Sequence, residues 1–119
     1  MFQTVLQEVV DNTQGAIASV LMGFDGITVD SYIRDDHPLN VETVGMEFSV
    51  VLTQIKQAAE MLEIGNTREV AVQAEGMTTV IRLINDEYFI AVVVAPTGNF
   101  GKARFLLRTQ APKLLESLT

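Results

Sequence analysis

Few residues of this chain could perform chemistry. The sequence contains no cysteine and one histidine, His37, which follows Asp35 and Asp36 in the segment RDDHPLN. A histidine beside carboxylates could serve acid–base catalysis or bind a metal ion. A solvated loop histidine is the more common case, because the segment is polar and Pro38 follows directly. We therefore predict no catalytic residue and no metal site here.

A glycine-rich segment, PTGNFGKARF, places Lys102 at the start of an expected helix. A helix N-terminus can hold an anion, but the spacing differs from that of the phosphate-binding loop G-x-x-x-x-G-K-[ST]. Glycine at a cap or at a point of close packing is the more common reason. The acidic pairs Asp35–Asp36 and Asp86–Glu87 fall in expected turns, and no arginine stands out. We predict a protein with no active site of its own and no cofactor.

Charge and hydropathy exclude further classes. The 119 residues carry a formal net charge of −7, which disfavours nucleic acid and anionic membrane surfaces as partners. No apolar run reaches the roughly 18 residues of a membrane span, and the N-terminal MFQTVLQEVV does not resemble a signal peptide. We expect one domain, residues 1–119, in the cytoplasm, without membrane insertion, whose partner is a protein or a small molecule.

Hydrophobic periodicity predicts three helices and five strands. The first helix begins at Phe2, and an Asp25-Gly26 turn then joins two strands in a hairpin. Asn40 can cap a long helix. We expect that helix to end at Ile64, followed by strands Glu69–Ala74, Thr78–Ile84 and Tyr88–Ala95, and by a last helix from Asn99 toward Leu118 with a kink or break before Pro112.

The order α-β-β-α-β-β-β-α predicts an α+β fold, an α/β sandwich with a five-stranded antiparallel sheet. Strands joined by hairpins pair antiparallel. The segment YFIAVVVA is apolar on both faces, which is typical of a central strand that is covered on both sides. We therefore expect helices on both faces of the sheet.

The long helix carries two apolar stripes rather than one. At about 100° per residue, one sector about 100° wide should face the sheet. It contains Val41, Val44, Phe48, Val51, Leu52, Ile55, Ala59 and Leu62. Near the opposite pole, where a surface helix should carry charge, lie Met46, Val50, Met61 and Ile64, with the uncharged Thr53 and Gln57 between them.

Three explanations of this second stripe remain open. It could be ordinary exposed apolar scatter, it could be covered by the first or last helix, or it could be covered by a second chain. We favour the second chain, because methionine is common at surfaces that repack against partners and exposed apolar patches usually mark interfaces. The strand EVAVQAE supports self-association, since it has neither the lysine nor the proline that discourages edge pairing.

Three stretches carry a resemblance to a known family: VLMGFDGITVDSYI, REVAVQAEGMTTVIRLINDEYFIAVVV after the long helix, and APTGNFGKARFLLRTQAPKLLESL, with Gly101 and Arg104 in the last. Over essentially the whole chain, the pattern resembles the Roadblock/LC7 family, and most closely its MglB type. The resemblance implies an adaptor without enzymatic activity that forms a homodimer and binds a small Ras-like GTPase. It also implies that the adaptor stimulates GTP hydrolysis without donating an arginine.

The resemblance also implies which residues would act. Paired third strands and adjacent central helices would form the dimer interface, with Met46, Val50, Thr53, Gln57, Met61, Ile64, Glu69, Val70, Ala71, Val72, Gln73, Ala74 and Glu75. The GTPase would bind Met46, Val50, Thr53, Gln57 and Met61. Two alternatives stay open. The chain could be a structural scaffold subunit of a motor, polarity or signalling complex, or a small-ligand sensor with a pocket between sheet and helix.

Overall fold

The computed structural model describes residues Met1–Thr119 and contains the predicted elements in the predicted order. Both the α+β class and the order α-β-β-α-β-β-β-α are confirmed. The elements are α1 (Phe2–Asp11), β1 (Ala16–Gly23), β2 (Thr28–Ile33), a 3₁₀ turn (Arg34–Asp36), α2 (Val41–Met61), β3 (Glu69–Gln73), β4 (Thr78–Leu83), β5 (Tyr88–Val94) and α3 (Phe100–Leu118).

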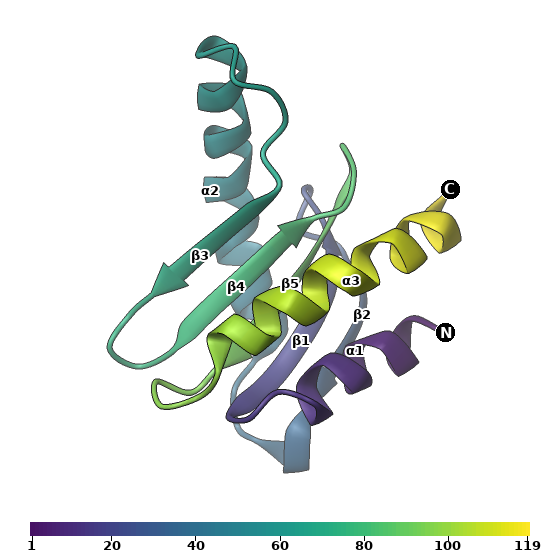
Figure 1. Ribbon diagram of the computed structural model, residues 1–119, viewed down its shortest axis with the longest axis vertical. Helices are drawn as coiled ribbons and strands as arrows, with labels where there is room; N and C mark the ends of the chain where they lie inside the picture. The colour runs from purple at the N-terminus through teal and green to yellow at the C-terminus, as the bar shows by residue number, and fades with distance from the viewer.

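The five strands form one antiparallel sheet in the order β2-β1-β5-β4-β3 (Figure 1). β5 is the middle strand and buries Phe89 through Val94 completely or nearly so, as its two apolar faces predict. β3 lies at one edge, which confirms the position expected for EVAVQAE. One side of β3 is therefore free to pair with another strand.

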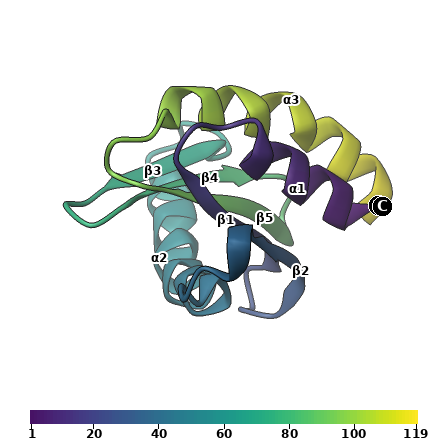
Figure 2. The same ribbon diagram turned by 90° about the horizontal axis from the view of Figure 1, so that it is seen from below.

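Helices cover both faces of the sheet, as predicted. α1 and α3 lie side by side on one face, and α2 lies on the other (Figure 2). Each face has its own apolar core, with Leu6, Leu107 and Leu114 in the first and Met22, Leu52 and Phe89 in the second. Because the sheet separates the two layers, neither α1 nor α3 can cover the outer stripe of α2. That explanation of the stripe is wrong.

Small side chains set the rotation of α2 on the sheet. Gly45 is buried, and a Cβ there would lie 2.9 Å from Met22 Cε and 3.3 Å from Val20 Cγ1. Ser49 is also buried, and its hydroxyl donates to the Met46 carbonyl oxygen at 2.7 Å, so the buried polar atom is satisfied. The helix therefore packs along Gly45 and Ser49 more closely than larger residues would permit.

This rotation corrects two predictions. Val51 and Leu62, expected to face the sheet, are 44% and 67% exposed. Sequence reasoning placed the buried stripe by apolar residues alone, whereas the structure buries Gly45 and Ser49 beside Val41, Leu52 and Ala59. The neighbouring flank of α2 is thereby turned out to solvent.

The ends of α2 follow side-chain chemistry, with one difference from prediction. Asn40 Oδ1 accepts a hydrogen bond from the Thr43 N–H at 3.1 Å, so the expected cap is present. α2 ends at Met61, three residues before the expected end, and the chain turns away through Gly65 at φ +91°.

α3 continues through Pro112 to Leu118, so the expected break is absent. Pro112 and Arg108, whose carbonyl loses its helical partner, are both exposed to water, which can replace the lost bond. Beyond the proline, Leu114 is fully buried in the core between α3 and the sheet. That contact holds the last turns of the helix in place.

Candidate protein-interaction surface

The polar residues singled out by the sequence do not converge on a reactive site. His37 is exposed, and its Nδ1 accepts a hydrogen bond from the Leu39 N–H at 3.1 Å. The structure contains no group of three or more His, Asp or Glu side chains that could hold a metal ion. Burial, followed by the Asp11 carboxylate that accepts its hydrogen bond, raises the pKa of the Tyr32 hydroxyl. This last contact ties α1 to β2 and serves the fold.

The glycine-rich segment before α3 serves packing and capping. A Cβ on Gly98 would contact the Val94 side chain and lie 2.8 Å from the Gln14 carbonyl oxygen. Asn99 Oδ1 accepts from the Lys102 N–H at 3.0 Å and so occupies the start of the helix. The segment therefore presents no prepared cradle for a phosphate, in agreement with the packing explanation.

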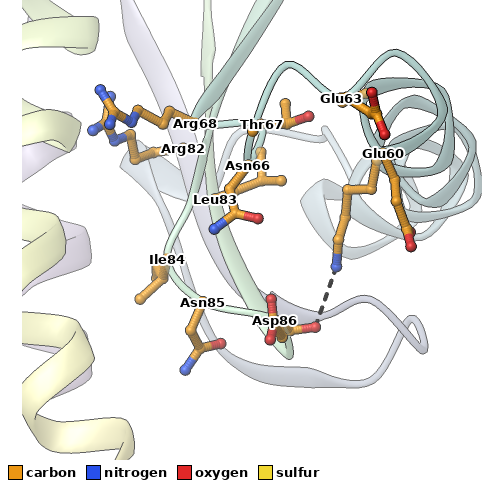
Figure 3. A pocket seen from close by; sticks show the side chains of 13 residues that line it. Glu60, Glu63, Asn66, Thr67, Arg68, Arg82, Leu83, Ile84, Asn85 and Asp86 are labelled. Atoms are coloured by element: carbon orange, nitrogen blue, oxygen red, sulfur yellow. Dashed lines mark hydrogen bonds between the residues drawn. The ribbon is translucent and has the colours of Figure 1, made fainter.

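A polar pocket lies between the end of α2 and the β4–β5 turn (Figure 3). Lys56 Nζ donates to the Asp86 carbonyl oxygen at 3.3 Å and lies 3.8 Å from the centre of the Phe24 ring. The side chains of Arg68 and Arg82 both point away from α2 (Figure 3). Acidic and basic side chains are mixed along the pocket wall and do not converge on one point where a ligand could bind. Its contacts brace the part of α2 that extends past the sheet (Figure 1).

The outer stripe of α2 is fully available to a partner. Met46, Val50 and Met61 are 53%, 63% and 84% exposed, and Thr53 and Gln57 between them are exposed as well. Ile64, just past the end of the helix, is 71% exposed. Apolar side chains this exposed in a run along one helix are typical of an interaction surface. We call Met46, Val50, Thr53, Gln57 and Met61 the outer stripe.

A second exposed apolar surface lies on the flank of α2 nearest β3. Val44 and Phe48 on this flank form an apolar groove with Val72 of β3 and Met77 of the β3–β4 turn. Val51 and Leu62 extend the same flank toward the end of the helix. We call Val44, Val51 and Leu62 the β3-side flank. The clue in the sequence is the pair of small residues Gly45 and Ser49, which permits the rotation described above.

β3 offers unpaired backbone groups directly beside this flank. The Arg68 carbonyl accepts from the Leu83 N–H at 2.9 Å, and the Ala74 N–H donates to the Met77 carbonyl at 3.0 Å. Because antiparallel ladders alternate, even-numbered residues bond β4 and odd-numbered ones point outward. The outward groups belong to Glu69, Ala71 and Gln73. Ala74 and Glu75, predicted to belong to the strand, lie past its end at Gln73, at the turn.

Solved structures of known proteins share this architecture. MglC from Myxococcus xanthus is 41% identical, with 96% of each chain covered and a TM-score of 0.69. A Roadblock/LC7 domain from Streptomyces avermitilis is 13% identical over 98% of this chain and 96% of that chain, with a TM-score of 0.84. The gliding protein MglB from Thermus thermophilus is 17% identical over 95% of this chain and 84% of that chain, with a TM-score of 0.83.

These comparisons carry different weight. The identity to MglC over nearly the full length of both chains shows common family membership. The likeness to the Streptomyces domain and to MglB, at much lower identity, shows the fold alone. No protein-family model and no curated protein sequence matches the chain. None of the three helices has the length and apolar character that a membrane span requires.

Proposed function

The chain belongs to the Roadblock/LC7 domain family, and from this premise we propose that it is a homodimeric adaptor, not an enzyme, that binds a small Ras-like GTPase. The observation that carries the proposal is the exposed apolar surface of α2, which α1 and α3 cannot cover because the sheet lies between them. An adaptor works through such surfaces and needs no reactive group of its own. The similarity to MglC, MglB and a Roadblock/LC7 domain supports a regulatory role.

The dimer contact is assigned to the free edge of β3 and the β3-side flank. Two β3 strands paired antiparallel around a twofold axis would satisfy the outward groups of Glu69, Ala71 and Gln73. The same axis would bring the two α2 helices together along Val51 and Leu62, on the side where each helix overlooks β3. Sheet pairing would supply directional hydrogen bonds and the helix contact would bury apolar surface.

The GTPase is assigned to the outer stripe. In the dimer described above, Met46, Val50 and Met61 lie on the pole of α2 that points away from the sheet, so they stay exposed after dimerisation. Two such stripes side by side would form one broad apolar surface rimmed by polar residues, as a protein interface requires. Modulation of GTP hydrolysis is a further step, in which the dimer would reshape the active site of the GTPase.

The test is a binding titration with a Ras-like GTPase from the same genome, loaded with a non-hydrolysable GTP analogue. The double variant Val50→Glu/Met61→Glu should weaken binding by about 100-fold or more, since it places two charges in an apolar contact. Thr4→Glu/Gln7→Glu makes the same charge change at exposed positions of α1, on the opposite face of the sheet, and is the matched control that should bind like the wild type. If no such GTPase binds the wild type, the proposal is wrong.

A structural scaffold subunit is the second candidate. The identity to MglB is 17%, which carries the fold and not the activity of that protein. The outer stripe would then bind a subunit of a motor, polarity or signalling complex. Affinity capture with the wild type and with Val50→Glu/Met61→Glu separates the two functions. Stripe-dependent recovery of large assemblies without a GTPase favours the scaffold.

A further inference from the structure

Positive charge is concentrated on the side of the sheet opposite α2. α3 alone carries four of the eight lysines and arginines and one acidic residue, Glu116, in a chain with a net charge of −7. Arg68 and Arg82 point to the same side (Figure 3). Arg82 lies on this face because residues two apart on a strand share a face, and Val80 of β4 packs in the core under α1 and α3. Such a concentration of positive charge in an acidic protein is a candidate binding site for an anionic group.

Most of this positive charge has no partner within the chain. Arg104 forms the only ion pair of the region, with Glu69 Oε2 at 2.7 Å. Glu69 also stands directly opposite Arg82 in the register of β3 and β4, so the carboxylate that pairs with Arg104 is also the acidic group placed opposite Arg82. Lys102, Arg108 and Lys113 form no ion pair. An anionic group from outside the chain would therefore meet an uncompensated field.

An exposed aromatic ring stands among these cations. Phe105 is 49% exposed, on the side of α3 opposite the buried Ala103 and Leu107. Lys102 Nζ and Arg108 Cζ lie 5.9 Å and 5.6 Å from the ring centroid. The outer pole of a surface helix usually carries only polar residues. A ring flanked by two cations instead offers both an apolar anchor and charge.

We propose that Lys102, Phe105, Arg108 and Lys113, the basic face of α3, form a second docking surface that binds an acidic segment of a partner protein. Carboxylates of the segment would bind the three unpaired cations, and an apolar side chain of the segment would cover Phe105. Arg68 and Arg82 would extend the positive field toward β3. This surface is separate from α2 and does not depend on the proposed function.

The surroundings of α3 favour a narrow peptide over a flat anionic membrane. α1 lies beside α3 on the same face and carries Glu8 and Asp11, both exposed. A membrane surface would bring its negative charge against these acids as well as against the cations. A single peptide strand or helix can follow α3 and keep its carboxylates close to the lysines and arginines, within a screening length of about 8 Å at physiological salt.

Two docking surfaces on opposite faces would let one adaptor hold two partners at once. The sheet separates the basic face of α3 from the outer stripe of α2, as Figure 2 shows for the two helices. A protein bound to α2 therefore leaves α3 accessible. The geometry is that of a linker between a first partner, recognised by apolar contacts, and a second one, recognised by charge.

The test uses a fluorescein-labelled synthetic peptide of glutamate and leucine, with binding followed by fluorescence anisotropy at low salt. The wild type should bind saturably, and amide signals along α3, not those of α2, should shift in the nuclear magnetic resonance spectrum. Lys102→Glu/Arg108→Glu should weaken binding by about tenfold or more, and added salt should weaken wild-type binding. Phe105→Ala should weaken it with little change in the salt dependence.

The controls distinguish a local site from bulk charge. Lys56→Glu makes the same charge change per residue on the α2 side and should leave the affinity within about twofold. Thermal unfolding of each variant checks that the fold is kept. Equal peptide binding by wild type and Lys102→Glu/Arg108→Glu would overturn the proposal. So would absence of peptide binding to the wild type, or α3-dependent binding to phosphatidylserine vesicles in place of the peptide.

Discussion

At the residue scale, glycines mark the points of closest approach in this fold. Gly45 lets α2 approach β1, and Gly98 lets the segment before α3 approach the start of β1. The sequence predicts a cap or close packing as the reason for glycine in the segment that contains Gly98, but it does not single out Gly45 inside the long helix. The groups that contact each glycine come from other parts of the sequence. The sequence alone therefore does not show which glycine lies at a close contact.

Gly98→Ala should destabilise the protein by about 1–3 kcal/mol, because the added methyl group meets the Gln14 carbonyl oxygen at 2.8 Å and the Val94 side chain. Gly101→Ala is the matched control, since its nearest neighbour would be Asn99 Oδ1 at 3.5 Å. That variant should be neutral or slightly stabilising, as alanine favours a helix. Urea unfolding of both variants measures the difference, and equal stability would contradict the packing role of Gly98.

At the element scale, the sequence predicted the order of helices and strands, the central place of β5 and the edge place of β3. The failures have physical causes. Apolar periodicity located α2 but not its rotation, which Gly45 and Ser49 decide by being small. Proline rules predicted a break at Pro112, whereas an exposed helix backbone with a buried Leu114 beyond it tolerates the lost bond. Local rules do not include such tertiary contacts.

Pro112→Ala should therefore stabilise the protein, by about 1–3 kcal/mol, since alanine restores an N–H donor for the Arg108 carbonyl and removes the ring. Thermal unfolding monitored by circular dichroism measures the change. Lys113→Ala, at the next exposed position of α3, is the control and should change stability by less than about 0.5 kcal/mol. A loss of stability in Pro112→Ala would mean that α3 needs the proline for its path over the sheet.

The free edge of β3 permits a selective test of strand pairing. Ala71 points its N–H outward, so Ala71→Pro removes a donor that β4 does not use. The monomer should remain folded, while dimer formation should fall by about tenfold or more, because the strands can no longer form a complete ladder. Ala71→Thr keeps the N–H and should dimerise like the wild type. Unchanged dimerisation of Ala71→Pro in sedimentation would place the contact elsewhere.

At the scale of the whole molecule, exposed apolar area and charge are divided between two faces. The α2 layer carries Met46, Val50, Val51, Met61 and Leu62 in the open, and the α3 layer carries the unpaired cations. Sequence reasoning found Met46, Val50 and Met61 because a helical wheel displays them, but it placed Val51 and Leu62 on the sheet side. It did not identify the α3 layer as a site, since Arg82 is far from α3 in the chain and only the alternation of side chains along β4 places it on the side of α3.

The last prediction separates the two exposed surfaces of α2, the outer stripe and the β3-side flank. Val51→Glu/Leu62→Glu, on the β3-side flank, should convert a dimer into a folded monomer in light scattering, because two charges would enter the helix contact. Val50→Glu/Met61→Glu, with the same charge change on the outer stripe, should remain a dimer and lose only the partner.

Protein concentration supplies an independent measurement of the same contact. The melting temperature of a dimer rises with concentration by mass action, whereas that of the Val51→Glu/Leu62→Glu monomer should not. Should both double variants become monomers, the outer stripe also takes part in the twofold contact, and the partner must bind elsewhere on α2. Should neither do so, the β3 edge alone holds the dimer, and the apolar flank of α2 is available to a partner.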